Sequence, residues 1–260
     1  MSDPSGTDRA DRPRRDLHPH LGPHQRDGRR RISELLASSP VPPAELPRNL
    51  SLYLDRETVG DLLTTADLYR RILDVPGEVF ELGVHWGRRM SLFVALRELL
   101  EPHNYTRRIV GFDTFEGFPE VTGLDGEHAL IRAGGLAVGA DYVSHLTDVL
   151  DACELDGPQA HVRRYEIRTG DVRETLPRYL SDHPEAVVSL AYFDLDLHDP
   201  TRACLDLLLE RMPRGSILAF DQFAQLNFPG ETAAVREVMG LSGTRFERLP
   251  YHPYPVFTTL

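Results

Sequence analysis

Residues 79–90 read VFELGVHWGRRM, and this stretch decides the fold. The run before its first glycine is apolar and favours a β-strand, and Gly83 and Gly87 bracket a tight turn. After the turn, leucine and phenylalanine recur at helical spacing over residues 91–100. Glycines between a strand and a helix let the backbone come close to a ligand, and a helix N-terminus favours polar or anionic groups. The stretch therefore predicts a nucleotide-type binding site, an interpretation that competes with glycines kept for packing.

The spacing of this turn indicates which nucleotide it suits. The dinucleotide fingerprint has a second glycine two residues after the first, where a pyrophosphate approaches the backbone. Here that position is His85, and the pattern is E-x-G-x-x-x-G with Glu81 at the end of the strand. This argues against NAD and favours a cofactor without a pyrophosphate, such as S-adenosylmethionine.

The composition limits the class of protein. A chain of 260 residues with a hydrophobic content of 41% suits one medium-sized α/β domain with a full core. Its net charge of −11 argues against nucleic acid as a partner. All 29 basic residues are Arg, which excludes a P-loop ATPase and Schiff-base chemistry, because both need a lysine.

The cysteines and the apolar runs indicate the cellular compartment of the protein. Cys153 and Cys204 form no close-spaced motif, so neither a zinc site nor a disulfide framework is indicated, and a reducing cytoplasm fits. No apolar run is long enough to cross a membrane, and the N-terminus lacks the apolar stretch of a signal peptide. We therefore expect a cytoplasmic protein with no membrane partner.

The chain divides into a tail and a domain. Residues 1–31 are rich in Arg, Asp, Pro, His and Gly and nearly lack apolar residues, so we expect them to be disordered. The predicted domain, residues 32–260, begins with helices at 32–37 and 52–73, and the second helix carries Thr58, Asp61 and Thr65 on a polar face. The stretch at about 114–163 is long and rich in turn residues, which predicts a lid or a substrate-binding insertion.

Strands and helices alternate through the rest of the domain. Strands are predicted at 79–82, 107–112, 165–169, 187–193 and 216–220, helices at 91–100, 142–153, 173–180 and 202–211, and a terminal hairpin at 246–249 and 256–259. This alternation predicts a Rossmann-like, doubly wound α/β sheet with an antiparallel end.

Acidic residues follow the predicted strands with regularity. Ligands of such sheets bind beyond the carboxyl ends of the strands. An acid after the second strand commonly takes ribose hydroxyls. Acids after neighbouring strands are candidates to share one divalent ion, and oxygen ligands favour Mg²⁺ over zinc. The residues at or just past the predicted strand ends are Glu81, Asp113 (second strand), Asp171, Asp194 and Asp221 (neighbouring strands), and Asp196.

Other polar residues have competing structural interpretations. Asp196 and Asp199 are expected to face solvent or to cap the following helix, since Asp199 precedes Pro200. His198 is a candidate base, with a packed or solvated histidine as the alternative. The arginine pairs at 88–89, 107–108 and 163–164 are candidate contacts for an anion, although paired arginines more often form solvated faces.

Several segments together resemble a known family. They are ELGVHWG, GFDTFEGFP, the Gly170-Asp171-Val172 turn, FDLDLHDPT, and ILAFDQF followed by FPGETAAV, and they extend over most of residues 50–240. At these residues the chain resembles the class I S-adenosylmethionine-dependent methyltransferases, and more narrowly the macrocin-type sugar O-methyltransferases of antibiotic biosynthesis. The nearest branch acts on TDP-6-deoxyhexoses, as in TDP-rhamnose 3-O-methylation in enediyne pathways. The resemblance implies a seven-stranded sheet with a reversed last strand.

The resemblance also implies a set of site residues. Metal ligands would be Asp194, Asp221 and Gln222, and Gln222 stands where the family pattern has a second acid, so metal affinity is expected to be weak. The implied contacts of S-adenosylmethionine are Glu81, Leu82, Gly83, Gly87, Ser91, Asp113, Thr114, Phe115, Gly170, Asp171, Val172 and Asp194.

The expected reaction is methyl transfer to a sugar hydroxyl. Asp194 is the expected base and metal ligand, with His198 as a second catalytic candidate, and Mg²⁺ polarises the hydroxyl. The acceptor is expected to be a small-molecule sugar, nucleotide-linked, and the protein to be a homo-oligomer, because apolar surface on the N-terminal helices needs cover. The alternatives are a metal-dependent phenolic or catechol-type O-methyltransferase and a non-catalytic S-adenosylmethionine-binding protein.

Overall fold

The computed structural model describes residues 21–139, 141–251 and 254–260. Contacts divide the chain into two units, residues 1–56 and residues 57–260, and each is described by itself. Within the described residues, no helix combines the length and the apolar character needed to span a bilayer.

The smaller unit is helical. It contains α1 (Pro23–Ala37), α2 (Leu46–Asn49) and the 3₁₀ helix η1 (Leu50–Tyr53), and none of these described helices buries a residue. The prediction of disorder is therefore wrong for residues 23–31, which form the first turns of α1. Proline suits the first helical position, and Arg30 pairs with Glu34 (2.7 Å) and with Asp27 on the same face of the helix. Residues 1–20 of the predicted tail lie outside the described residues.

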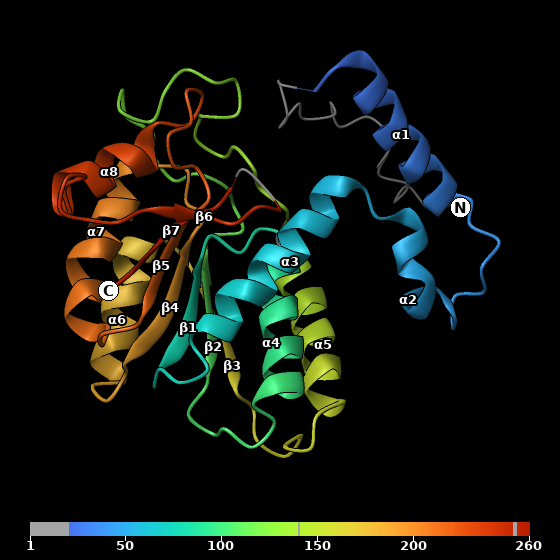
Figure 1. Cartoon of the computed structure of the whole chain (residues 1–260), viewed down its shortest axis with the longest axis horizontal. Helices are drawn as coiled ribbons and strands as arrows, with labels where there is room; N and C mark the ends of the chain where they lie inside the picture. Colours follow the sequence, from blue (N-terminus) through green and yellow to red (C-terminus); the bar gives the residue numbers. More distant parts are fainter. Residues whose placement is uncertain (1–20, 140, 252–253) are drawn as a thin grey trace, which may run out of the picture. The chain divides into compact units, whose positions relative to one another are not determined.

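The larger unit is built on one mixed sheet. Its strands, within the described residues, lie in the order β3-β2-β1-β4-β5-β7-β6 (Figure 1). The first five strands pair in parallel, and β7 runs antiparallel to β5 and to β6. This confirms the predicted Rossmann-like sheet of seven strands with a reversed last strand. The strands are β1 (Glu78–Leu82), β2 (Ile109–Asp113), β3 (Tyr165–Thr169), β4 (Val188–Phe193), β5 (Ile217–Phe220), β6 (Glu247–Arg248) and β7 (Val256–Thr259).

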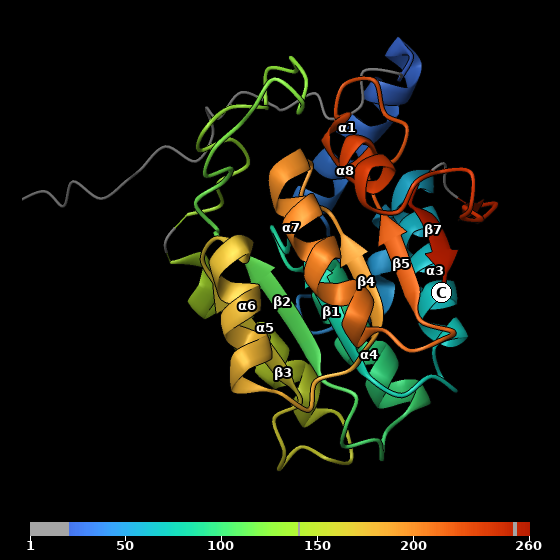
Figure 2. The same ribbon diagram turned by 90° about the vertical axis from the view of Figure 1, so that its left-hand side faces the viewer.

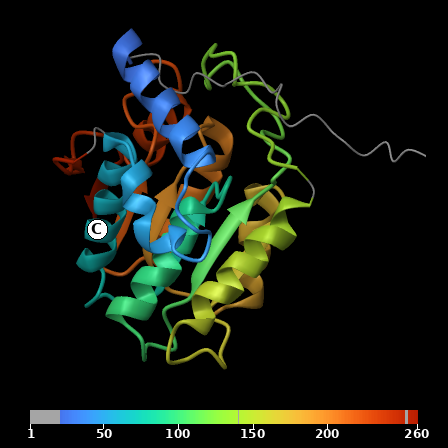
Figure 3. The ribbon, with the colours of Figure 1, turned by 90° about the vertical axis from the view of Figure 1, so that its right-hand side faces the viewer.

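Helices cover both faces of the sheet. One layer consists of α3 (Arg56–Arg71), α4 (Arg88–Leu100) and α5 (Tyr142–Leu155) (Figure 3). The opposite layer consists of α6 (Val172–Asp182), α7 (His198–Leu208), which continues as the 3₁₀ helix η2 (Leu209–Arg211), and α8 (Gly230–Val238) (Figure 2). Each layer encloses an apolar core against the sheet, as β1, β4 and β5, buried on both faces, require. The sequence prediction lacked α8.

The stretch between β2 and β3 has two parts. Its second part, α5, packs against α4 in the helical layer, so the predicted insertion at 114–163 includes one ordinary crossover helix. Its first part, residues 114–139, is a loop that rises beyond the carboxyl ends of the strands (Figure 2). The loop is fastened by Asp125, whose carboxylate accepts hydrogen bonds from the backbone N–H of His198 (2.6 Å) and of Thr122 (2.6 Å).

Each arginine pair has one buried member, so the interpretation of these pairs as solvated faces is wrong for half of their residues. Arg107, 1% exposed, donates to the Glu101 carboxylate (2.8 Å) and to the carbonyls of Ile72 and Val75 (2.9 Å each). A guanidinium with five donors can satisfy several buried acceptors at once, which explains how arginine enters this core. The buried members are Arg89, Arg107 and Arg164, and the more exposed members are Arg88, Arg108 and Arg163.

Candidate functional site

The glycine turn after β1 brings two strand ends together. Gly83 has φ +95°, and its N–H donates to the carbonyl of Phe112 in β2 (2.9 Å). The N–H of Asp194, just after β4, donates to the carbonyl of Leu82 (2.8 Å). A Cβ added at Gly83 would lie 2.0 Å from the Asp194 carbonyl oxygen, so this position admits no side chain. The turn therefore sets the position of Asp194.

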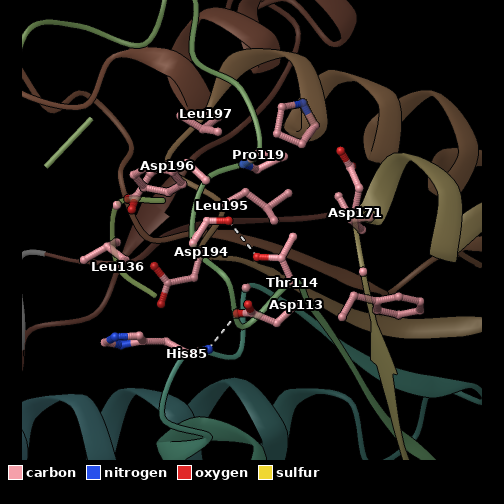
Figure 4. A pocket seen from close by; sticks show the side chains of 18 residues that line it. His85, Asp113, Thr114, Pro119, Leu136, Asp171, Asp194, Leu195, Asp196 and Leu197 are labelled. Carbon is pink, nitrogen blue, oxygen red and sulfur yellow. Dashed lines mark hydrogen bonds between the residues drawn. The ribbon is translucent and has the colours of Figure 1, made fainter. Parts of the chain in front are cut away.

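A pocket opens beyond the carboxyl ends of β1, β2, β3 and β4. Its volume is about 720 Å³ when its open mouth is included. Figure 4 shows His85 and Asp194 toward one end of the pocket and Asp171 toward the other, with Asp113 between them. The pocket thus lies where ligands of doubly wound sheets bind.

Asp113 holds the loops that form the pocket floor. Its Oδ2 accepts hydrogen bonds from the N–H groups of Val84 and His85, at 2.7 Å each, and its Oδ1 accepts one from Phe115 (2.6 Å). The carboxylate is only half-buried and lines the pocket, and its contact with ribose hydroxyls stays a prediction.

Asp171 marks the other end of the pocket. It caps α6 by accepting a hydrogen bond from the N–H of Arg173 (2.9 Å), and it also accepts from the Arg173 guanidinium (2.6 Å). Burial opposes ionisation of Asp171, but the hydrogen bonds from Arg173 outweigh it and lower the pKa of the carboxyl. Asp171 is therefore a charged acceptor at the edge of the pocket.

The predicted cofactor residues separate into two groups. Those that line the pocket are Gly83, Asp113, Thr114, Gly170, Asp171, Val172 and Asp194. Those that lie around it are Glu81 and Leu82, buried in β1, Gly87, which begins α4, Ser91, whose hydroxyl donates to the Gly87 carbonyl, and Phe115, packed in the core. Pocket residues that the sequence prediction missed include His85, Phe118, Leu136 and Leu197.

An acid cluster surrounds Arg89 beside the pocket. Arg89, 3% exposed, donates to Asp194 Oδ2 (3.0 Å), to Asp61 Oδ1 in α3 (3.1 Å) and to Asp221 Oδ1 after β5 (3.4 Å). Its guanidinium lies 3.6 Å from the ring centre of Tyr192 in β4. Asp61, predicted on a polar face of its helix, is thus turned into the site. We use the name acid cluster for Asp61, Glu81, Asp194, Asp196, Asp221 and Glu231.

The acid cluster contains more carboxyl groups than Arg89 alone can neutralise. Burial raises the pKa of Glu81 to about 8, against the attraction of Arg89, and raises that of Glu231 to about 8 as well. Burial and the neighbouring charge of Asp221 raise the pKa of Asp194. Within the described residues, Glu81 Oε2 and Asp196 Oδ1 have no hydrogen-bond partner. Such a cluster attracts a further proton or cation.

Glu231 ties together the loops that carry the acids. From the first turn of α8, its Oε1 accepts from the N–H groups of Leu195 (3.0 Å) and Asp196 (3.2 Å), and its Oε2 accepts from Gln222 (3.0 Å). This arrangement draws Asp196 inward, where it is 5% exposed with φ +63°, so the prediction that Asp196 faces solvent is wrong. Burial raises the pKa of the Asp196 carboxyl.

The chemistry of the residues after β4 and β5 suits a hard cation. Asp194, Asp221 and Gln222 offer side-chain oxygens, and Glu81 Oε2 and Asp196 Oδ1 have no hydrogen-bond partner among the described residues. In the described part of the chain, no three His, Cys, Asp or Glu side chains are arranged to hold a metal ion, so a site here needs the amide oxygen of Gln222. The Gln222 amide lies 3.4 Å from Asp221 Oδ2.

His198 lies outside the pocket lining. Its ring is buried at the start of α7, with Nδ1 2.7 Å from Asp199 Oδ1 and Nε2 3.0 Å from Glu237 Oε2. Asp199, predicted to face solvent or to cap the following helix, lies in the first turn of α7 with a side chain that is 49% exposed. Because two carboxylates occupy both ring nitrogens, this arrangement favours the packed alternative for His198 over the role of a base.

The chain matches a family model that covers most of the larger unit. The match is to the TylF family, macrocin O-methyltransferase, over residues 65–239. No curated protein matches the chain.

Two structures of CalS11 and one of NovP are similar to this chain. The crystal structure of CalS11, calicheamicin methyltransferase, is 43% identical over 97% of this chain and 99% of that chain, with a TM-score of 0.90. The apo structure of CalS11, described as a TDP-rhamnose 3'-O-methyltransferase of calicheamicin biosynthesis, is 41% identical over 92% of this chain and 96% of that chain, with a TM-score of 0.82. The O-methyltransferase NovP, 19% identical over 77% of this chain and 79% of that chain with a TM-score of 0.58, shares the fold.

Proposed function

Since this chain belongs to the TylF family of macrocin O-methyltransferases and is an S-adenosylmethionine-dependent O-methyltransferase, we propose that it methylates a hydroxyl of a TDP-linked 6-deoxyhexose such as TDP-rhamnose. The observation that carries this proposal is the 43% identity over 97% of the chain to CalS11, which is described as acting on TDP-rhamnose. Similarity over nearly the whole chain covers the loop at 114–139 as well as the sheet, and such loops select the acceptor.

In the proposed reaction the sugar oxygen attacks the methyl carbon of S-adenosylmethionine. The new O–CH₃ bond forms as the S–CH₃ bond breaks, and its electron pair stays on sulfur, which gives S-adenosylhomocysteine. The hydroxyl proton goes to the carboxylate of Asp194. A sugar hydroxyl is a weak nucleophile near neutral pH, so a base held at the pocket contributes to the rate. The pocket contributes by aligning sulfur, methyl and oxygen.

Asp194 is the residue of the acid cluster best placed for this proton. It lines the pocket, and its side chain is 29% exposed, so an acceptor can reach it. The raised pKa of its carboxyl makes it a stronger proton acceptor than an ordinary aspartate. Arg89 keeps one of its oxygens in place, and the other is left to accept the proton or to bind a cation.

A Mg²⁺ ion would be held by Asp194, Asp221 and Gln222. When bound, such an ion polarises the hydroxyl as a Lewis acid. The surplus of buried carboxylates supports a cation here, and the neutral Gln222 keeps its affinity weak.

Two further expectations stay proposals. The helices of the smaller unit expose Leu35 (59%) and Leu52 (65%), which supports a homo-oligomer that covers them, and light scattering of the full chain tests this. Cys153 and Cys204 are free thiols, as suits the expected cytoplasmic location.

The test is transfer of an isotope-labelled methyl group from S-adenosylmethionine to a panel of acceptors, with and without EDTA. The panel contains TDP-rhamnose, other TDP-6-deoxyhexoses, glycosylated aglycones and catechols. We expect labelled TDP-sugar, with a rate that falls on chelation and returns with added Mg²⁺. Transfer to catechols with none to any sugar would instead support the phenolic alternative.

A further inference from the structure

Arg89 lies where the two expected metal ligands face each other. Its Nη1 is 3.0 Å from Asp194 Oδ2 and its Nη2 is 3.4 Å from Asp221 Oδ1. Asp61 fixes the guanidinium from α3 at 3.1 Å, and the ring of Tyr192 supports its face. The Tyr192 hydroxyl in turn donates to Asp221 Oδ1 (2.6 Å). The Arg89 guanidinium is thus fixed in position by several different elements of the fold.

This contact uses part of the donor set that a divalent ion needs. One oxygen of Asp194 and one of Asp221 already accept from Arg89, and the third expected ligand, Gln222, is neutral. A divalent ion bound to the remaining oxygens would lie a short distance from a fixed positive charge. At such a separation in a partly buried site, charge repulsion weakens binding by a large factor.

The unpartnered carboxyl oxygens of the acid cluster explain why a second cation can still enter. Glu81, 1% exposed, has one oxygen 3.6 Å from Arg89 Nη1, and its Oε2 has no hydrogen-bond partner among the described residues. Asp196 Oδ1, also buried, has no partner either. The cluster therefore holds the Arg89 cation permanently and has carboxyl groups left that take up a proton or a weaker, exchangeable cation.

We propose that Arg89 is the resident cation of the acid cluster, a positioning residue that holds Asp194 and Asp221 in place and keeps the affinity of the cluster for a divalent cation low. This inference deepens the proposed function, since it concerns the same acids. It does not depend on the acceptor, because metal binding can be measured without any sugar.

The first test is a titration of the full chain with Mn²⁺, in which electron paramagnetic resonance measures the concentration of the free ion. The variants are Arg89→Met and, as a matched control, Arg88→Met. The Arg88 side chain is 54% exposed and, among the described residues, pairs with Asp61 (3.3 Å) but with neither of the two expected aspartate ligands. We expect Arg89→Met to bind Mn²⁺ at least about tenfold more tightly than the natural chain and Arg88→Met to change affinity less than about threefold. Equal or weaker binding by Arg89→Met overturns the proposal.

Two more variants keep the test decisive if Arg89→Met does not fold. Asp61→Asn/Arg89→Met removes one acid together with the cation and is expected to tighten Mn²⁺ binding in the same direction. Arg89→Lys keeps the charge but not the forked donors, so it is expected to tighten Mn²⁺ binding less than the Met variants do. Tightening by Arg89→Lys as large as that of the Met variants would show that charge is not the cause.

Failure of this inference is distinguishable from failure of the proposed function. S-adenosylhomocysteine binding, measured by calorimetry on every variant, reports whether the pocket is intact. If no sugar is methylated but Mn²⁺ binding follows the expected pattern, the substrate proposal fails and the role of Arg89 stands. If TDP-rhamnose is methylated but the Mn²⁺ affinity does not change when Arg89 is replaced, the substrate proposal stands and the role of Arg89 fails.

Discussion

The substitution Gly83→Ala tests how the glycine turn positions the site. The new Cβ would lie 2.0 Å from the carbonyl oxygen and 2.6 Å from the carbonyl carbon of Asp194. Both atoms belong to backbone that is tied to β1 through the bond from Asp194 N–H to the Leu82 carbonyl, so neither can turn aside as a side chain would. The end of β1 and the end of β4 must therefore separate.

The size of the effect has two parts. A side chain at φ +95° costs about 1–2 kcal/mol in backbone conformation. Forcing the clash to relax costs a further 1–3 kcal/mol or so, as in other overpacked interiors. We expect a loss of roughly 2–5 kcal/mol in the free energy of unfolding. A shift of about 1 Å in Asp194 is also expected to lower kcat about a hundredfold.

The assay pairs urea unfolding, followed by circular dichroism, with methyl transfer to TDP-rhamnose. Gly240→Ala is the matched control, because Gly240 has φ +69° with no atom within 4 Å of an added Cβ, so it carries the conformational cost without the clash. The reasoning is refuted if Gly83→Ala is as stable and as active as Gly240→Ala.

Two further predictions concern the buried arginine at the other end of the sheet. Arg107→Met removes the buried guanidinium that pairs with Glu101 and donates to the carbonyls of Ile72 and Val75, so it should lower the free energy of unfolding by about 3–5 kcal/mol. Arg108→Met, at a 27% exposed side chain, should lower it by less than about 1 kcal/mol, and equal losses in urea unfolding would contradict this. Burial raises the pKa of Glu101, but the hydrogen bonds from Arg107, Tyr69 and Asn104 outweigh burial, and the net pKa is lowered. The ionised carboxylate therefore stabilises the fold at pH values above its ordinary pKa, and this stability is lost as the pH falls through the pKa of the folded state. The difference in unfolding free energy between the natural chain and Glu101→Gln should therefore shrink between about pH 6 and pH 3, and a difference independent of pH would contradict the assignment.

Local patterns in the sequence were sufficient for the sheet. β3 has the predicted bounds, and β1, β4 and β5 differ from prediction by one residue at an end, because buried parallel strands are short apolar runs that turn residues delimit. The predicted acids after the strands also meet at one edge, since parallel strands end together there. The strands and the acids that follow them could be predicted because they depend on the periodicity of the sequence and on sheet topology.

The residues that the sequence prediction missed depend on contacts between distant elements. Arg89 and Asp61 are 28 positions apart, and only the packing of α3 against the site turns both inward. Asp196 is buried because Glu231, in the unpredicted α8, takes its backbone N–H. The spacing of a charged side chain along a helix does not reveal a partner on a distant element. The prediction therefore followed the usual preference of charged residues for solvent and placed these side chains at the surface.

The central claim is that Asp194 accepts the proton of the sugar hydroxyl, and the most direct measurement is the turnover of Asp194→Asn with TDP-rhamnose. Asparagine keeps the shape and an oxygen acceptor for Arg89 but cannot take up the proton. Asp199→Asn, at a 49% exposed side chain outside the pocket, is the control. We predict that Asp194→Asn loses at least about a hundredfold in kcat while S-adenosylhomocysteine binding changes little, and that Asp199→Asn stays near the natural rate. Near-natural turnover by Asp194→Asn would contradict the account.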